Sequence, residues 1–84
     1  MKHSRPDYNG IQDATNHIPD DEPVFVIRAK DVCSAATVEM WALLAEQAGA
    51  DSDMIESARK HAAVMRAYGK AHGWTVPDLP GVMS

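Results

Sequence analysis

Three charged residues, Arg28, Lys30 and Asp31, could carry chemistry because they stand between a short apolar run and the start of a candidate helix. Two cations beside the free N–H groups of a helix N-terminus suit an anion such as a phosphate. The alternative is structural, with Arg28 paired to Asp31 or to a neighbouring acid at an ordinary strand exit. The sequence leaves both interpretations open.

A second group lies further along, where His61, Met65, Tyr68 and His72 recur at helical spacing. His61 and Tyr68 could stack on or hydrogen-bond a base-like ligand, with Arg66 nearby. The alternative is a helix flank that packs Met65 against the core and leaves the other side chains in solvent. His61 and His72 lie about three helical turns apart, which is too far for one metal ion.

Other kinds of chemistry find little support in the chain. The single cysteine, Cys33, permits no internal disulfide, and no Cys or His pair has the spacing of a zinc site. No base accompanies Cys33, so a structural role is expected for its thiol. The serines lack nucleophile-elbow surroundings, and the acids lack a metal-loop pattern. We therefore predict a protein that is not an enzyme and that needs no metal and no cofactor.

Composition limits the partners. The formal net charge is −4 at pH 7, which argues against DNA or RNA as the main partner because such binding needs a basic face. The longest apolar run, residues 24–27, is far too short to span a membrane. No hydrophobic segment follows the first Lys and Arg, so no signal peptide is predicted. Together with a free cysteine, these features predict a cytoplasmic protein.

One strand and two helices are predicted to position the candidate residues. Residues 24–29 alternate β-branched, aromatic and other side chains as a short strand does. The first helix is predicted to begin at the N-cap Ser34 and to end before Gly49. The second is predicted to begin at the N-cap Asp51 and to end at Gly73.

These elements divide the chain into a polar N-terminal arm over 1–22, a core over 23–74 and an extended tail over 75–84. The short connection between the helices predicts an antiparallel helical hairpin. The expected fold class is therefore α+β, mainly α.

Apolar residues cover a narrow face of the second predicted helix and a wide face of the first. In the second helix, small residues form one narrow stripe: Ile55, Ala58, Ala62, Met65 and Gly69. In the first helix, the predicted stripe is Val38, Trp41, Ala45 and Ala48, broadened by Met40, Leu43 and Leu44. That surface is wider than one partner helix would cover.

A lone strand also needs a partner, because unpaired backbone groups along both of its edges invite association. No second strand of similar quality occurs in the sequence. We therefore predict a homo-oligomer in which the strand pairs with its copy, or with a neighbour's arm. The predicted interface residues are Val24, Phe25, Val26, Ile27 and Trp41.

From Asp20 onward the chain resembles a group of short, mostly uncharacterised proteins of tailed bacteriophages and prophages. The resemblance rests on "IPDDEPVFVIRAKD", on "TVEMWALLAEQAGADSDMIESARKHAAVMRAY" and on the closing "VPDLP". Such relatives often have a proline at the start of each helix, where this chain has Ala35 and Ser52. The resemblance implies phage origin and an accessory role in the host cytoplasm, without an established activity.

Two functions are consistent with these features of the chain. The first is a non-enzymatic sponge that sequesters a small anionic ligand, most plausibly a cyclic signalling nucleotide of host immunity, at an oligomer interface. Its site residues would be Arg28, Lys30, Asp31, His61, Arg66 and Tyr68. The second is a protein–protein interaction factor that engages a host or virion protein through its acidic surface and its N-terminal arm.

Overall fold

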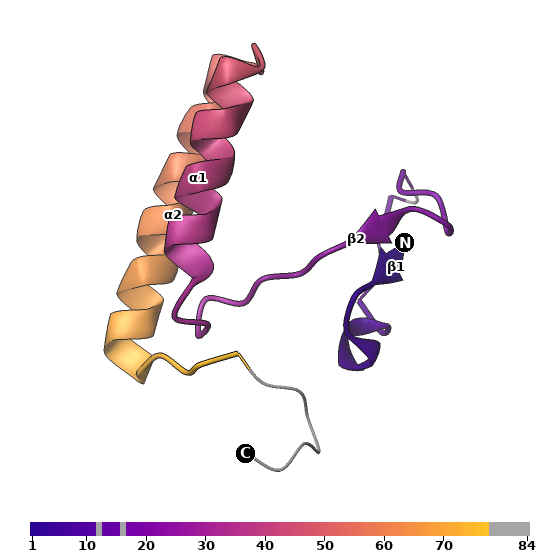
Figure 1. The fold of residues 1–84 in the computed structure, drawn as a ribbon, viewed down its shortest axis with the longest axis horizontal. Helices are drawn as coiled ribbons and strands as arrows, with labels where there is room; N and C mark the ends of the chain where they lie inside the picture. Colours follow the sequence, from indigo (N-terminus) through magenta and orange to yellow (C-terminus); the bar gives the residue numbers. More distant parts are fainter. Residues whose placement is uncertain (12, 16, 78–84) are drawn as a thin grey trace. The chain divides into compact units, whose positions relative to one another are not determined.

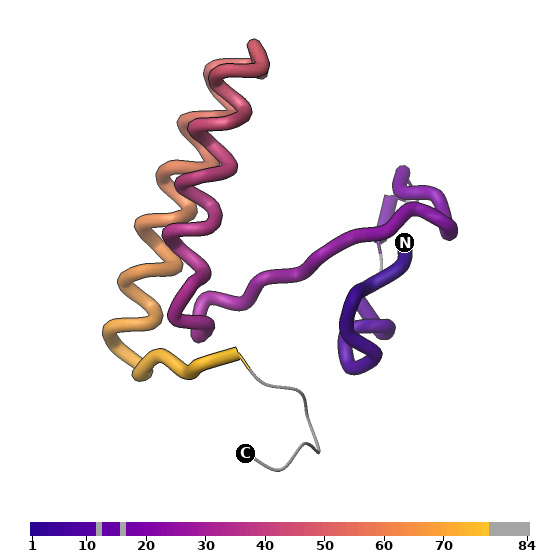
Figure 2. The backbone as a smooth tube through the Cα atoms, viewed as in Figure 1, coloured from indigo at the N-terminus to yellow at the C-terminus, as the bar shows by residue number. Residues whose placement is uncertain are grey.

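Two helices dominate the computed structural model, which describes residues 1–77 apart from 12 and 16. Helix α1 spans Ser34–Gln47 and helix α2 spans Ser52–His72. The two lie side by side, and residues 48–51 join them at one end of the pair (Figures 1 and 2). A minor β component lies in the N-terminal part, so the expectation of a mainly helical chain is confirmed.

The contact between the helices consists mainly of small side chains. The narrow stripe predicted for α2 is confirmed, since Ile55, Ala62, Met65 and Gly69 are buried and Ala58 is half-buried. The prediction for α1 is partly wrong. Its buried apolar positions are Ala35 and Ala42, with Val38 and Ala45 half-buried, whereas Trp41 and Ala48 are exposed. Alanines let the two backbones approach closely, and the larger side chains of α1 are left outside.

Local signals fix the end of α1 and both ends of α2. The Asp51 side chain accepts hydrogen bonds from the backbone N–H groups of Asp53 and Met54, at 2.8 and 3.3 Å. Gly49 and Gly73 have φ angles of +84° and +81°, a left-handed conformation that side chains with a Cβ adopt only with strain. The predicted N-cap and both terminal glycines are therefore confirmed.

Helix α1 begins differently from the prediction. Ser34 is its first helical residue and is completely buried, and its hydroxyl donates to the carbonyl oxygen of Ala29 at 3.3 Å. The N-cap position belongs to Cys33, whose side chain makes no capping hydrogen bond. Asp31 supplies the acceptor instead, because its carboxylate receives the backbone N–H of Cys33 at 2.7 Å.

The segment after α2 returns to the segment before α1. Thr75 and Asp31 form an isolated parallel bridge, in which Thr75 N–H donates to the Lys30 carbonyl and Val32 N–H donates to the Thr75 carbonyl. Trp74 packs its indole against Gly69, where there is no room for a Cβ. Trp74 thus lies against α2, whereas Val76 is exposed.

Residues 1–27 form a separate compact unit from residues 28–77. Within it, β1 (Lys2–His3) pairs in parallel with β2 (Pro23–Val24), and a short 3-10 helix, η1, spans Pro6–Tyr8. Asp13 organises the following turn by accepting hydrogen bonds from Thr15, His17 and Ile18. These bonds, first that of the Thr15 side chain, lower the pKa of Asp13.

The strand differs from its prediction in length and in partner. Of residues 24–29, only Val24 lies in β2, and the backbone from Phe25 to Arg28 is in neither strand nor helix. The partner strand is β1 of the same chain rather than a neighbouring copy. High β-propensity describes side chains that fit a half-buried pleated surface. Phe25, 69% exposed, has no such surface in this structure.

Candidate interaction surface

The predicted anion-binding residues lie just before α1. Arg28 and Lys30 are exposed, and within the described residues their side chains make no hydrogen bond or ion pair. Asp31 does not pair with Arg28 through its side chain, because its carboxylate caps Cys33; the two are joined by a backbone hydrogen bond from Asp31 N–H to the Arg28 carbonyl. Two cations are therefore open to solvent, while the acid beside them has a structural task.

Two of the predicted ligand residues of α2 contact other side chains of the protein. Arg66 donates two hydrogen bonds to the Glu39 carboxylate of α1, at 2.6 and 2.8 Å. Hydrogen bonding within this pair lowers the pKa of Glu39 and raises that of Arg66. Tyr68 stacks on His72 with ring centroids 4.0 Å apart. Arg66 and Tyr68 therefore have partners within the protein.

No described contact unites the two predicted groups into one site. His61 is exposed and has no polar partner within the described residues, while Met65 is buried. This is the arrangement of a helix flank that packs Met65, which was the alternative interpretation of these residues. In addition, no three His, Cys, Asp or Glu side chains gather within the described part of the chain in a way that could hold a metal ion.

An open apolar groove of about 650 Å³ lies along α1. We call it the α1 groove; its lining residues are Val32, Cys33, Ala36, Thr37, Met40, Trp41 and Leu44. None of them is charged. Trp41 is 48% exposed and Leu44 56% exposed, and several large apolar side chains exposed together are more informative than one exposed leucine.

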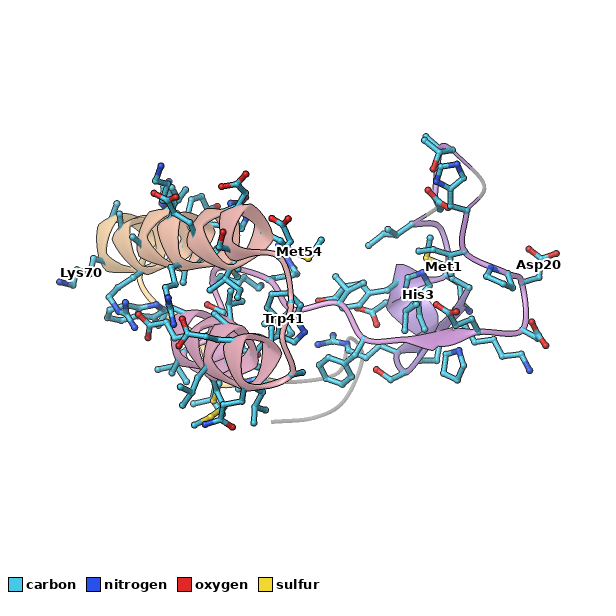
Figure 3. The ribbon with its side chains drawn as sticks, turned by 90° about the horizontal axis from the view of Figure 1, so that it is seen from above. Met1, His3, Asp20, Trp41, Met54 and Lys70 are labelled. Atoms are coloured by element: carbon cyan, nitrogen blue, oxygen red, sulfur yellow. The ribbon has the colours of Figure 1, made fainter. Side chains whose placement is uncertain are left out.

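Apolar side chains of α2 extend this surface. Trp41, Leu44, Met54, Val64 and Tyr68 are all exposed, and each immediately precedes a buried or half-buried helix position. Because one residue turns a helix by about 100°, on each helix these side chains lie to one side of the contact with the other helix, and we call the five side chains the apolar flank. In the view along the helices, the labelled Trp41 and Met54 lie on the same side (Figure 3).

The opposite flank carries the charges that join the helices. Glu39, Glu46, Arg59 and Arg66 each immediately follow a half-buried or buried position. They form the pairs Arg66–Glu39 and Arg59–Glu46, the second at 3.4 Å. The helix pair therefore has one ionic flank and one apolar flank.

The predicted oligomer interface is distributed over both units. Val24, Val26 and Ile27 are half-buried within the first unit, and Phe25 is exposed there. Trp41 belongs to the second unit and is shared by the α1 groove and the apolar flank. The sequence indicated this surface only through the breadth of apolar residues in the first helix, which did not say which of them α2 would leave uncovered.

None of the helices described here is both long enough and apolar enough to cross a membrane. No protein-family model, curated protein or solved structure matches this chain. The surface is therefore interpreted from its own chemistry.

Proposed function

We propose that this chain is a non-enzymatic protein-binding module that acts through the apolar side of its helix pair. The observation that carries this proposal is the α1 groove, where Trp41, Met40 and Leu44 are about half exposed and no charge is present. Contiguous exposed apolar surface rimmed by polar residues is typical of protein interaction sites. A groove along one helix suits an apolar helical segment with anchors at i, i+3, i+4 and i+7.

An antiparallel helical hairpin is part of the proposal. It is supported by the register of the two ion pairs, Glu39 with Arg66 and Glu46 with Arg59. A step of seven residues up α1 (46 − 39) is matched by a step of seven residues down α2 (66 − 59). Such a hairpin offers a rigid surface, so a partner would bind without first ordering the groove.

A peptide selection tests the proposal. Helical peptides displayed as a library are selected on the full chain and then measured on two variants, Leu44→Lys and Leu43→Lys. Both leucines are on α1 and exposed, at 56% and 43%, but only Leu44 lines the groove. We expect amphipathic peptides that lose about tenfold or more in affinity on Leu44→Lys and little on Leu43→Lys. Peptides that respond equally to both variants would contradict the proposal, as would a selection without enrichment.

Sequestration of a small anionic ligand, such as a signalling nucleotide, is the second candidate. It is supported by Arg28 and Lys30, which are exposed and whose side chains make no ion pair with the residues that the structure describes. The engagement of Arg66 by Glu39 weakens the wider site predicted from the sequence. Native mass spectrometry of protein purified from cells would test it. A releasable small mass that Arg28→Ala abolishes would favour this function, and a ligand-free protein would exclude it.

Phage origin and an accessory role in the host cytoplasm stay predictions from the resemblance and the composition, and an anti-defence role is part of this second candidate only. The protein-binding proposal does not depend on them.

A further inference from the structure

The helix pair buries mostly small side chains and leaves most of its large apolar ones exposed. The buried apolar residues are Ala35, Ala42, Ile55, Ala62 and Met65, three of which are alanine. The apolar flank holds a tryptophan, a tyrosine, a leucine, a methionine and a valine, all exposed. A chain of 84 residues has little core to spare, and small domains often gain stability by association.

We propose that the apolar flank is covered by a second copy of this chain, in a two-fold symmetric dimer of helix pairs. This inference rests on the proposed function, because it names the occupant of the same apolar side. In a two-fold contact the same patch meets itself, so the patch must not repel itself. The flank satisfies this condition, since none of its five residues is Asp, Glu, Lys, Arg or His, and the polar side chains that the same helical position places beside them, Thr37, Ser57 and His61, include no acid.

The distribution of charge favours contact between two copies through the apolar flank rather than through another surface of the chain. The chain has a formal net charge of −4, so two copies repel each other on average. The acids of α1, Glu39 and Glu46, are both paired with arginines on the opposite flank. A contact through the apolar flank leaves those pairs in solvent and brings no acid against an acid.

The apolar area of the flank is large enough for the centre of a dimer interface. A Trp or Tyr side chain buries about 150–250 Å² when it is fully covered, and Trp41 and Tyr68 each retain about half of their exposure. With Leu44, Met54 and Val64 the flank offers several hundred Å² of apolar surface. A standard interface takes about 800 Å² from each partner, with an apolar centre and a polar rim. The flank supplies such a centre, with Trp41 as its expected hot spot.

Sedimentation velocity across a dilution series tests the dimer on the full chain. We expect the wild type and Leu43→Lys to be dimers that dissociate on dilution. Leu44→Lys should raise the dissociation constant by about tenfold or more, because it places a charge in the desolvated centre. Far-UV circular dichroism checks that each variant is folded. Val64→Lys, at the most exposed flank position (61%), is the second variant and should also weaken the dimer.

Each other outcome overturns the inference. A wild type that stays monomeric at every concentration shows that no second copy binds. Dimers that persist in both Leu44→Lys and Val64→Lys place the contact elsewhere, and equal weakening by Leu43→Lys removes the assignment to this flank. Peptide selection separates the two proposals: a monomer that still binds peptides through Leu44 refutes the dimer but supports the protein-binding module. A Leu44-dependent dimer that selects no peptide supports the dimer alone.

Discussion

Glu39 and Arg66 connect the two helices through two hydrogen bonds in a bidentate arrangement. The bidentate geometry is the strong form of an Arg–carboxylate contact. Both side chains are partly exposed, so solvent screens their attraction. The pair therefore fixes the register of the helices more than it stabilises them. Because Arg66 is bound to Glu39, it is less available to bind a ligand.

The Glu39–Arg66 pair should make stability depend on pH in the acid range. The pKa of Glu39 is lowered from its ordinary value of 4.5, chiefly by the hydrogen bonds from Arg66. Its contribution is complete above that value and is lost as the pH falls through the lowered pKa. We expect the wild type to melt at a higher temperature than Glu39→Gln near neutral pH, and the difference to vanish in acid. Thermal melts followed by circular dichroism measure this.

The control is Glu56→Gln, which removes a carboxylate whose partner, Lys60, is on the same helix. The difference in melting temperature between the wild type and Glu56→Gln should not change with acid pH in the way expected for Glu39→Gln, because Glu56 does not connect the two helices. A difference between the wild type and Glu39→Gln that stays constant with pH would show that the Glu39–Arg66 pair is not formed.

Gly69 and Trp74 form a close packing contact whose loss can be measured. A Cβ at position 69 would overlap the indole of Trp74. We expect Gly69→Ala to displace Trp74 and to destabilise the chain by about 1–3 kcal/mol, as overpacking does. In a Trp74→Ala background the same change should instead stabilise by up to about 1 kcal/mol, since alanine is the better helix former. Chemical denaturation of the four proteins gives both values; the same sign in both backgrounds would contradict the contact.

The connection between the helices depends on residues whose roles are local. Asp51 accepts hydrogen bonds from two N–H groups of the first turn of α2, and Gly49 adopts a positive φ just after α1. Neither role requires a distant residue. These two positions explain why the break between α1 and α2 could be predicted from the sequence.

Removal of the α2 cap should weaken the helix pair. We expect Asp51→Ala to lower the free energy of unfolding by about 0.5–2 kcal/mol, because two backbone N–H groups lose their acceptor. Asp51→Asn keeps an acceptor oxygen and should retain most of the stability. Urea denaturation compares the three proteins. Equal losses for Ala and Asn would indicate that charge, rather than the capping bond, is what Asp51 contributes.

Features that depend on distant residues could not be predicted. Trp41 and Ala42 are adjacent in an apolar stretch of α1, and only the fit of alanines against α2 decides that Ala42 is inside and Trp41 outside. Arg66 was assigned to a ligand because its partner, Glu39, is 27 residues away. The sequence therefore predicted that α1 has an apolar face wider than α2 covers, but it did not predict which of the apolar residues remain exposed.

For the strand, the sequence predicted more structure than the chain forms. Residues 24–29 have the composition of a strand, and β-propensity was the whole basis for that prediction. A strand exists only where backbone groups find a partner, and the structure supplies one only at Pro23–Val24. Whether Phe25 and its neighbours contact a second copy remains a prediction of the sequence.

At the scale of the whole molecule, the described chain consists of two compact units, residues 1–27 and 28–77. Both helices, their ion pairs and the tail bridge between Asp31 and Thr75 lie in the second unit. The first unit holds the two short strands and the Asp13 turn. No hydrogen bond described here makes the helix pair dependent on the N-terminal unit.

A chain that begins at Arg28 should therefore keep the helix pair. We expect its far-UV circular dichroism, expressed per molecule, to be close to that of the full chain, since both helices lie within 34–72. Its melt should remain cooperative, because the contacts between α1 and α2 are unchanged. As a control in the full chain, Asp13→Asn loosens only the turn that Asp13 organises and should leave the helical melt unaltered. Loss of cooperative melting in the shortened chain would mean that the helix pair depends on residues 1–27 for its stability.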